Sequence, residues 1–464
     1  MELYVSEYSR YVIALLIALY TYECFAVFRF QDEERRKGIY VRQTILMFAF
    51  HFSSFLVICF KTGEISYLFF YAFQQIILYA AVMLFRMLYP KANRLVINNM
   101  CMLLSIGFVI LTRLDPAKAL RQFIIAAGSL AVSFVIPFFV HKFKFLKRLT
   151  WAYAMVGLAA LSVVLILGQT TYGSKLSYSI AGITFQPSEF VKILFVFFVA
   201  AALYDSAGFF EVFTTAVIAA GHVIVLVVSR DLGSALIFFI VYVLMVYVAS
   251  RNFLYVLAGA LGGSGAAYIA YSVFRHVQVR VQAWRDPWSV IDSTGYQITQ
   301  SLFAISNGGW FGLGLYEGTP TSIPFVEADF IFSAIAEELG IIFSICLILI
   351  CISCFIMFMN IAASLNDRFY ELIAFGLGVT YIFQVFLTIG GGTKFIPLTG
   401  VTLPLISYGG SSVLTTLVMF AVVEGLCAVK SDEELLPARK SKKKRKKVID
   451  DEKKQGSGQE DEEE

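Results

Sequence analysis

The sequence is poor in charged residues. Only 15% of its 464 residues are charged, whereas 58% are hydrophobic, and the mean hydropathy is +0.75. Soluble globular domains carry about 25% charged residues, so this composition argues against an ordinary soluble domain. Apolar runs of about 20 residues recur instead, and each is long enough to cross the roughly 30 Å hydrocarbon core as a helix. The sequence therefore predicts an all-α polytopic membrane protein.

Several motifs of enzymes and metalloproteins are missing. The sequence has no Walker lysine motif, no Gly-x-Ser-x-Gly and no HExxH, which excludes an ATP-driven transporter, a hydrolase of that type and a zincin. Its four histidines are scattered, and its seven cysteines lie mostly inside apolar runs without metal-ligand spacing. We therefore expect no disulfide framework and no metal site, with the cysteines acting as small buried hydrophobic residues.

Thirteen apolar segments are long enough to span a membrane. Their centres lie near residues 20, 52, 77, 105, 129, 159, 197, 220, 241, 263, 343, 380 and 416. The first lacks a basic flank before it and a small-residue cleavage site after it, so we interpret it as a span and not as a signal peptide. Lysine and arginine collect after the first, third and fifth spans, and such loops are usually cytoplasmic. An odd number of spans then places the N-terminus outside and the C-terminus in the cytoplasm.

The spans suggest a division of the chain into three parts. Residues 1–95 hold three N-terminal spans, residues 96–428 hold about ten more with a large outside loop at 276–325, and residues 429–464 form a charged tail. The tail changes from basic to acidic and should be disordered from about Asp432. Its basic cluster has two interpretations: it binds anionic membrane lipids, or it only fixes the topology.

Ionisable residues at the beginnings of spans are candidates for function, because charge is expensive at that depth. Glu189 and Lys192 share a helical face, three residues apart, and Asp231 opens another span. A structural ion pair between Glu189 and Lys192 is an equally good interpretation. For Glu337 and Glu338, a packing role is the better hypothesis.

The outside loop contains two carboxylates, Asp286 and Asp292, among aromatic and arginine side chains. A carboxylate in such a place could take a proton from an attacking sugar hydroxyl, although Asp292 in Asp-Ser-Thr-Gly295 would also suit a simple turn. The guanidinium groups of Arg280 and Arg285 nearby would suit phosphate oxygens. The glycines of residues 306–314 are spaced too irregularly for a dinucleotide-binding loop.

Several segments occur in an order that resembles a known family. They are Phe185-Gln-Pro-Ser-Glu189, Asp231-Leu-Gly-Ser-Ala-Leu236, Gly295-Tyr-Gln-Ile-Thr-Gln-Ser-Leu302, Asp329-Phe-Ile-Phe332, Ala336-Glu-Glu-Leu-Gly340 and residues 399–412. Together they resemble the signatures of the SEDS family, that of the FtsW, RodA and SpoVE proteins. The resemblance covers about residues 98–427, which implies a SEDS-type bundle of about ten spans preceded by three extra ones.

The resemblance implies a peptidoglycan glycosyltransferase that polymerises lipid II outside the cytoplasmic membrane with a class B penicillin-binding protein; no nucleic-acid partner is expected. It implies that the acidic residue shortly before Gly-Tyr-Gln is the base, for which Asp292 is the closer match and Asp286 the alternate. Glu189, Lys192 and Asp231 match cavity positions of the family, and Lys175 matches part of another motif. With lipid II as the implied substrate, Arg280, Lys175 and Lys394 are candidates for binding its diphosphate, or alternatively for anchoring the chain at the membrane interface.

Some positions depart from the family pattern. No proline follows Asp292, Ser229-Arg230 precedes Asp231 where the family has Gln-Pro, and Glu327-Ala-Asp329 stands where it has His-Thr-Asp. A divalent cation could assist by neutralising the leaving group, but no ligand cluster requires one. Two other functions stay open: a flippase for lipid-linked precursors and a scaffold that recruits a penicillin-binding protein. The sequence does not distinguish roles in elongation, division or sporulation.

Overall fold

The computed structural model describes residues 2–171, 174–180 and 183–430, without the side chains of residues 2–6, 144, 169–177 and 179–184. The predicted tail therefore lies, from residue 431, outside the described residues. The helices are α1 (Glu2–Arg29), α2 (Glu33–Thr62), α3 (Ser66–Leu88), α4 (Arg94–Leu114), α5 (Pro116–Ser133), α6 (Ile136–Lys142), η1 (Lys144–Arg148), α7 (Thr150–Leu167), α8 (Pro187–Leu203), α9 (Phe209–Val228), α10 (Leu232–Ser250), α11 (Leu254–Val273), α12 (Arg275–Arg285), η2 (Trp288–Val290), α13 (Tyr296–Gly308), η3 (Pro320–Ser322), α14 (Ile331–Ser364) and α15 (Arg368–Gly392).

Twelve described helices are long and apolar enough to cross a membrane, and the last of them is Gly410–Lys430, hereafter the last span. The remaining predicted span corresponds to α8, an apolar helix of 17 residues. A helical, multi-pass membrane bundle is thus confirmed. The bundle is accompanied by a small antiparallel sheet of β1 (Gln169–Thr171), β2 (Ser174–Ile180) and β3 (Ile183–Phe185) in strand order β1-β2-β3, which lies in the loop between α7 and α8.

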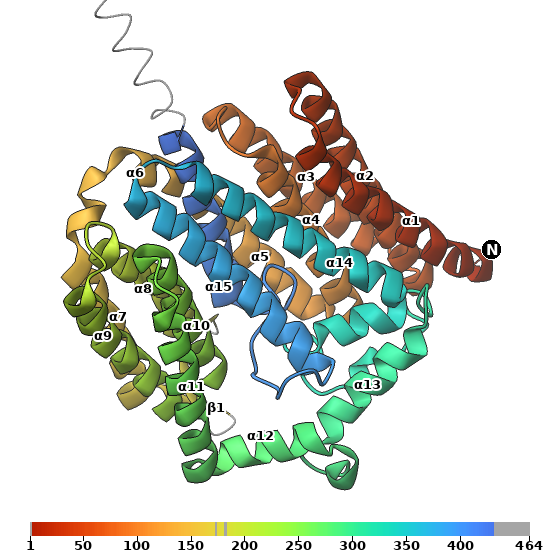
Figure 1. Ribbon diagram of the computed structural model, residues 1–464. Coiled ribbons are helices and arrows are strands. Elements are labelled where there is room, and N and C mark those ends of the chain that lie inside the picture. Colours follow the sequence, from red (N-terminus) through yellow and green to blue (C-terminus); the bar gives the residue numbers. More distant parts are fainter. Residues whose placement is uncertain (1, 172–173, 181–182, 431–464) are drawn as a thin grey trace, which may run out of the picture.

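The helices are arranged around α4, α14 and α15. The N-terminal helices α1 to α3 lie on one side, beside α4 and α14, and helices α7 to α11 lie on the other (Figure 1). Helix α12 runs across the end of the bundle and connects α11 to α13 (Figure 1). Helix α11 has no buried residue, whereas the apolar part of α4 is buried throughout. The core therefore lies around α4, and α11 is peripheral.

Buried polar side chains join the first two spans to that core. Asn99 on α4 accepts a hydrogen bond from the Tyr20 hydroxyl (2.9 Å) and donates one to the Ser353 hydroxyl of α14 (2.8 Å). Asn98 on the same helix donates to the Gln43 side chain of α2 at 3.1 Å. Polar contacts of this kind between helices fix one packing arrangement, because an unpaired polar group inside a membrane protein is costly.

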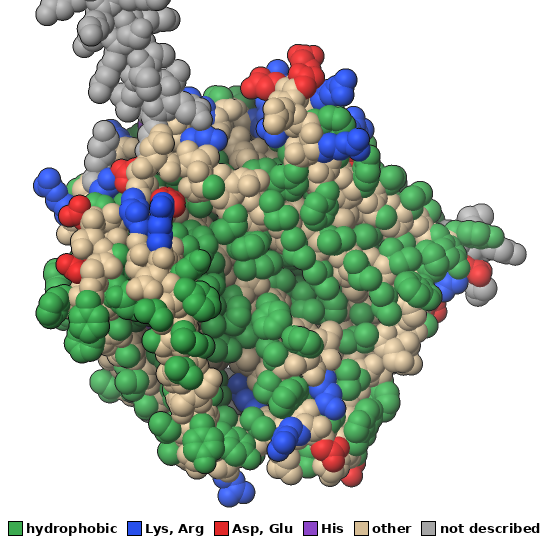
Figure 2. Space-filling model, in the orientation of Figure 1, with side chains coloured by type: hydrophobic (Ala, Val, Ile, Leu, Met, Phe, Trp, Pro, Cys, Tyr) green, Lys and Arg blue, Asp and Glu red, His purple; other side chains and the backbone are tan. Residues whose placement is uncertain are grey.

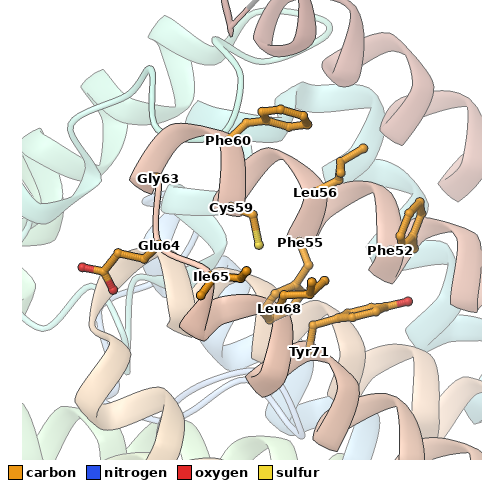
Figure 3. A pocket seen from close by; sticks show the side chains of 10 residues that line it. All are labelled: Phe52, Phe55, Leu56, Cys59, Phe60, Gly63, Glu64, Ile65, Leu68 and Tyr71. Carbon is orange, nitrogen blue, oxygen red and sulfur yellow. The ribbon is translucent and has the colours of Figure 1, made fainter.

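The surface matches a position in a membrane. Hydrophobic side chains cover the middle of the face shown in Figure 2, while charged side chains gather at its two ends. An apolar pocket of about 290 Å³ lies between α2 and α3 and is lined by Phe52, Phe55, Leu68 and Tyr71 among others, with Glu64 beside it (Figure 3). Its walls offer little polar chemistry, so we place no reaction there.

Candidate active site

A second cavity, of about 690 Å³, lies where helix beginnings converge, and it is polar. Its wall includes residues from the starts of α8, α10 and the last span, from the middle of α5, and from the segments that precede α14 and follow α15. The lining residues are Arg121, Ile124, Ile125, Gln186, Glu189, Asp231, Ser234, Phe325, Glu327, Ala328, Gly400, Val401, Thr402, Tyr408, Gly409, Gly410, Ser411 and Ser412.

The local sequence explains why α8 and α10 begin here. Pro187 occupies the first turn of α8, where a missing N–H costs nothing. Asp231 caps α10 by accepting a hydrogen bond from the Ser234 amide at 3.1 Å. Helix N-termini carry partial positive charge and unpaired N–H groups, so their convergence favours an anionic ligand.

Glu189 and Lys192 form a buried ion pair at one wall. Their charged atoms are 2.9 Å apart and the two residues are 6% and 3% exposed. The Thr415 hydroxyl donates to Glu189 (3.2 Å), and Lys192 donates to the Gln384 side chain of α15 (2.8 Å). The predicted pairing between i and i+3 is therefore present, and it joins α8 to α15 and the last span.

Asp231 lies at the same wall and is 8% exposed. One carboxylate oxygen accepts hydrogen bonds from the Ser188 hydroxyl (2.9 Å) and the Gln186 side-chain amide (3.3 Å), while the other caps α10. Glu189 and Asp231 are thus brought together by Gln186-Pro-Ser-Glu189, since the same short segment holds one carboxylate and supplies the other.

Arg280 lies between the outside loop and the cavity. Its guanidinium donates to the main-chain carbonyls of Leu398 (3.3 Å) and Thr399 (3.2 Å). Burial lowers the pKa of Arg280, while the negative charges of Asp329 and Asp231 oppose that shift. The side chain therefore tethers α12 to the segment after α15. A second tether comes from the Trp284 indole N–H, which donates to the carbonyl of Lys394 at 3.1 Å.

The loop carboxylates lie elsewhere. Asp286 and Asp292 are exposed and neither lines the cavity. Asp286 accepts a hydrogen bond from the Ser289 amide (3.3 Å), and Asp292 lies in the turn between η2 and α13. Lys394 is half-buried after α15, and Lys175 lies on β2, with its side chain outside the described residues. The structure thus groups Glu189, Lys192 and Asp231 with Arg280 nearby, but not Asp286 or Asp292.

Sequence reasoning did not select three charged residues near the cavity as candidates for the site. Glu327 receives a 2.5 Å hydrogen bond from Lys118, and Arg121 has no ion-pair partner among the residues that the structure describes. Asp329 lies beside Gly400 and Arg280; burial raises its pKa to about 6, although the Arg280 charge lowers it. Arg121 lies six residues into the helix that Asp115-Pro116 begins, and only that position could have suggested it.

Comparisons with known proteins agree on one family. The model of the FtsW, RodA and SpoVE cell cycle proteins matches residues 86–431. The peptidoglycan glycosyltransferase RodA of Mycobacterium tuberculosis is 32% identical over 367 residues, which covers 72% of this chain and 77% of the relative. A probable peptidoglycan glycosyltransferase FtsW of Aliivibrio salmonicida is 30% identical, with 72% and 86% covered.

Solved structures share the fold. A chain of a peptidoglycan synthase complex superposes with a TM-score of 0.63 at 24% identity, covering 74% of this chain and 98% of that one. RodA of Thermus thermophilus superposes with a TM-score of 0.54 at 23% identity, with 72% and 96% covered. The family match begins at residue 86, near the end of α3, so α1 and α2 lie outside it. Because that match covers most of the sequence, the chain belongs to the FtsW, RodA and SpoVE family, the SEDS family.

Proposed function

We propose that this protein is a peptidoglycan glycosyltransferase that polymerises lipid II at the outer face of the cytoplasmic membrane. The observation that carries the proposal is the cavity at the converging beginnings of α8, α10 and the last span, with the charged side chains of Arg121, Glu189 and Asp231 in its wall. The membership in a family whose curated relatives are named peptidoglycan glycosyltransferases supports the reaction class. The three N-terminal spans are then an addition to the family's core.

The distribution of basic residues supports the orientation. The cavity lies at the beginning of α8 and beside the first ten residues of α5, and the basic residues 142–148 follow the stretch α5 to α6 at its other end. Because basic loops are usually retained in the cytoplasm, the proposed orientation has the cavity, the N-terminus and the loop 276–325 outside, and the C-terminus in the cytoplasm. A cysteine introduced at exposed Ser293 should then react with a membrane-impermeant maleimide in intact cells.

The substrate would present three features that the site can address. Its diphosphate suits the helix N-termini and the cation of Arg121, with Lys175, Arg280 and Lys394 as further candidates. Its sugars suit the hydrogen-bonding groups of Gln186, Glu189 and Asp231. Its polyprenyl chain would remain among the apolar side chains at the membrane level, such as Ile124 and Ile125 in the cavity wall.

The reaction needs a base and a stabilised leaving group. In the proposed step, a carboxylate takes the proton of the acceptor hydroxyl while that oxygen attacks the anomeric carbon, and the bond to the lipid diphosphate breaks. Asp292 is the proposed base, with Asp286 as the alternate, because both are exposed on the loop that α12 holds beside the cavity wall. Cationic groups would stabilise the departing diphosphate.

A divalent cation and a partner protein are further parts of the proposal. The ion would neutralise the diphosphate; no group of three or more His, Cys, Asp or Glu side chains suited to a metal occurs in the described part of the chain. The proposed partner is a class B penicillin-binding protein that crosslinks the glycan. The peptidoglycan synthase complex with the similar fold, which coordinates polymerisation and crosslinking, supports this choice.

The test is polymerisation of labelled lipid II by the purified protein, alone and with its partner, with and without EDTA. Glycan polymer is the expected product. Translocation of lipid II across reconstituted vesicles, with no polymer in the presence of partner, would instead identify a flippase. If cavity substitutions leave growth intact while substitutions on a lipid-facing surface abolish partner binding, the protein is a scaffold.

A further inference from the structure

Helix α14 is interrupted near its beginning, and the segment after α13 fills the interruption. Gly340 has φ 85° and ψ 174°, which no helix residue adopts. Four main-chain hydrogen bonds join the two sides of this break to residues 309–314: Leu313 N to Glu337 O (3.0 Å), Gly314 N to Glu338 O (2.9 Å), Ile341 N to Gly309 O (2.9 Å) and Ile342 N to Trp310 O (3.2 Å). The segment thus replaces bonds that an unbroken helix would make within itself.

Glycines make this close approach possible. A Cβ atom at Gly340 would lie 2.3 Å from the Gly312 nitrogen, and a Cβ atom at Gly312 would lie 2.2 Å from the Glu338 oxygen. The two main chains therefore touch without side chains between them. This close approach explains the glycines of residues 306–314, which are spaced too irregularly for a dinucleotide-binding loop.

The first two spans hold the same segment from its other side. The Arg10 guanidinium on α1 donates to the Gly312 carbonyl at 3.2 Å, and the Tyr11 ring lies 5.0 Å from the Phe311 ring. At the end of α2, Lys61 forms an ion pair of 2.5 Å with Glu317. Helices α1 and α2 thus make three side-chain contacts with residues 311–317, although about 250 or more residues separate them from this segment in sequence.

The held segment continues directly from α13, the helix that follows Asp292. Helix α13 packs against α14, and its Ser301 hydroxyl hydrogen-bonds to the Ser333 hydroxyl at 2.6 Å and to the Gly392 carbonyl at 2.6 Å. The turn with Asp292 lies directly before the first residue of α13. The last residue of α13 is followed by residues 309–317, the segment that α1 and α2 contact. A displacement of residues 309–318 would therefore be transmitted to the loop carboxylates.

We infer that α1 and α2 form a brace for the active site, with Arg10, Tyr11 and Lys61 as positioning residues that keep residues 309–318 in the α14 break. This role rests on the proposed function, since it assigns the loop to that reaction. Residues 10, 11 and 61 lie before the family match, whereas Gly312 and Glu317 lie within it. The added spans thus act on a part of the enzyme that the family shares.

The test reverses one ion pair and compares it with another on the same helices. The variants are Lys61→Glu, Glu317→Lys and the double swap, all in the full-length protein. The matched control is Arg42, which pairs with Glu23 at 2.6 Å near the opposite ends of α1 and α2, again as Arg42→Glu and as the swap with Glu23→Arg. The first readout is hydrogen exchange at the amides of residues 313, 314, 341 and 342, with those of α4 as the reference. The second is the kcat and KM for lipid II per folded protein.

Each single reversal at Lys61 or Glu317 should speed exchange at the four amides by about five- to tenfold, because a favourable pair becomes repulsive. Exchange in α4 should stay unchanged, kcat should fall by a similar factor at unchanged KM, and the swap should restore both. The Arg42 variants should leave these values at the wild-type level.

Three results would overturn the brace: unchanged exchange in Lys61→Glu, an equal effect of Arg42→Glu, or faster exchange at unchanged kcat. A swap that restores neither exchange nor kcat would also overturn it. If the wild-type protein makes no polymer, the proposed function fails, and the exchange data then decide separately whether α1 and α2 hold the segment.

Discussion

The carboxylates of the cavity and those of the outside loop lie in opposite environments. Glu189 and Asp231 are buried, and each accepts hydrogen bonds from two or more side-chain or main-chain donors. Asp286 and Asp292 are exposed to solvent, and the contact made by Asp286 is with the amide of a neighbouring residue. A carboxylate that accepts several hydrogen bonds is fixed in position, whereas an exposed one is free to meet a substrate hydroxyl. On this difference we propose that the cavity carboxylates serve binding and shape and that the loop carboxylates serve proton transfer.

The largest expected effect is on activity, at the loop. Asp292→Ala should lower the rate of lipid II polymerisation by about 10²- to 10⁴-fold, as expected for loss of a general base. Because the side chain is exposed, the free energy of unfolding should change by no more than about 0.5 kcal/mol. Polymerisation assays and thermal unfolding of the detergent-solubilised protein measure the two quantities.

Asp286→Ala serves as the control for that substitution. It should leave most of the activity intact, because Asp286 is the alternate candidate and caps only a local turn. A large loss in Asp286→Ala together with full activity in Asp292→Ala would exchange the two assignments. Full activity in both variants would show that neither loop aspartate is the base, and Glu189 and Asp231 in the cavity would then become the candidates.

The second largest effect is on stability, at the cavity. Glu189→Ala should destabilise the protein by about 3–5 kcal/mol, because Lys192 would remain buried without its partner. The double substitution Glu189→Leu with Lys192→Met should recover a substantial part of that loss. Unfolding measurements on Glu189→Leu, Lys192→Met and the double variant give the coupling energy; losses that simply add would show that the pair is not the structural unit described above.

Sequence reasoning predicted the cavity side of this comparison well. The spacing of Glu189 and Lys192 on one helical face, and the position of Asp231 before an apolar run, were sufficient to expect all three as charged residues at span beginnings. The pattern of apolar runs likewise predicted the helices, because bilayer thickness fixes their length.

The sequence did not predict contacts that depend on distant segments. Arg280 donates to carbonyls more than 100 residues away in sequence, and Asp329 is half-buried because segments distant in sequence, such as that of Gly400, lie beside it. The α14 break needs Gly340 to meet Gly312, and neither glycine indicates its partner by spacing. Such tertiary contacts have no periodic signal, so sequence patterns alone leave them open.

A moderate effect is expected on substrate binding at Arg121. Arg121→Gln should raise KM for lipid II by about ten- to hundredfold with a smaller change in kcat, because a charge-assisted hydrogen bond to the diphosphate is lost. The exposed side chain should contribute little to folding. Arg121→Lys, which keeps the charge, should retain part of the affinity; an unaltered KM in Arg121→Gln would exclude this residue from the diphosphate site.

The smallest effect concerns Asp329, which lies near Arg280 and Gly400. Burial raises the pKa of Asp329 to about 6, against the lowering effect of the Arg280 charge, and Glu327 raises it further. A raised acid pKa means that the folded protein binds more protons than the unfolded chain, so this contribution to stability is present at low pH and is lost as the pH rises through about 6.

Between pH 5 and pH 7, Asp329 should therefore reduce the free energy of unfolding by about 1 kcal/mol. His276 titrates nearby with the opposite sign, because burial and the charges of Arg230 and Arg280 lower its pKa. The comparison that isolates Asp329 is thus the pH dependence of unfolding in the wild type minus that in Asp329→Asn. A difference of zero would mean that the Asp329 carboxylate is as accessible to water as those of Asp286 and Asp292 in the outside loop. Glu189 and Asp231 would then be the carboxylates of this region that the fold holds away from water.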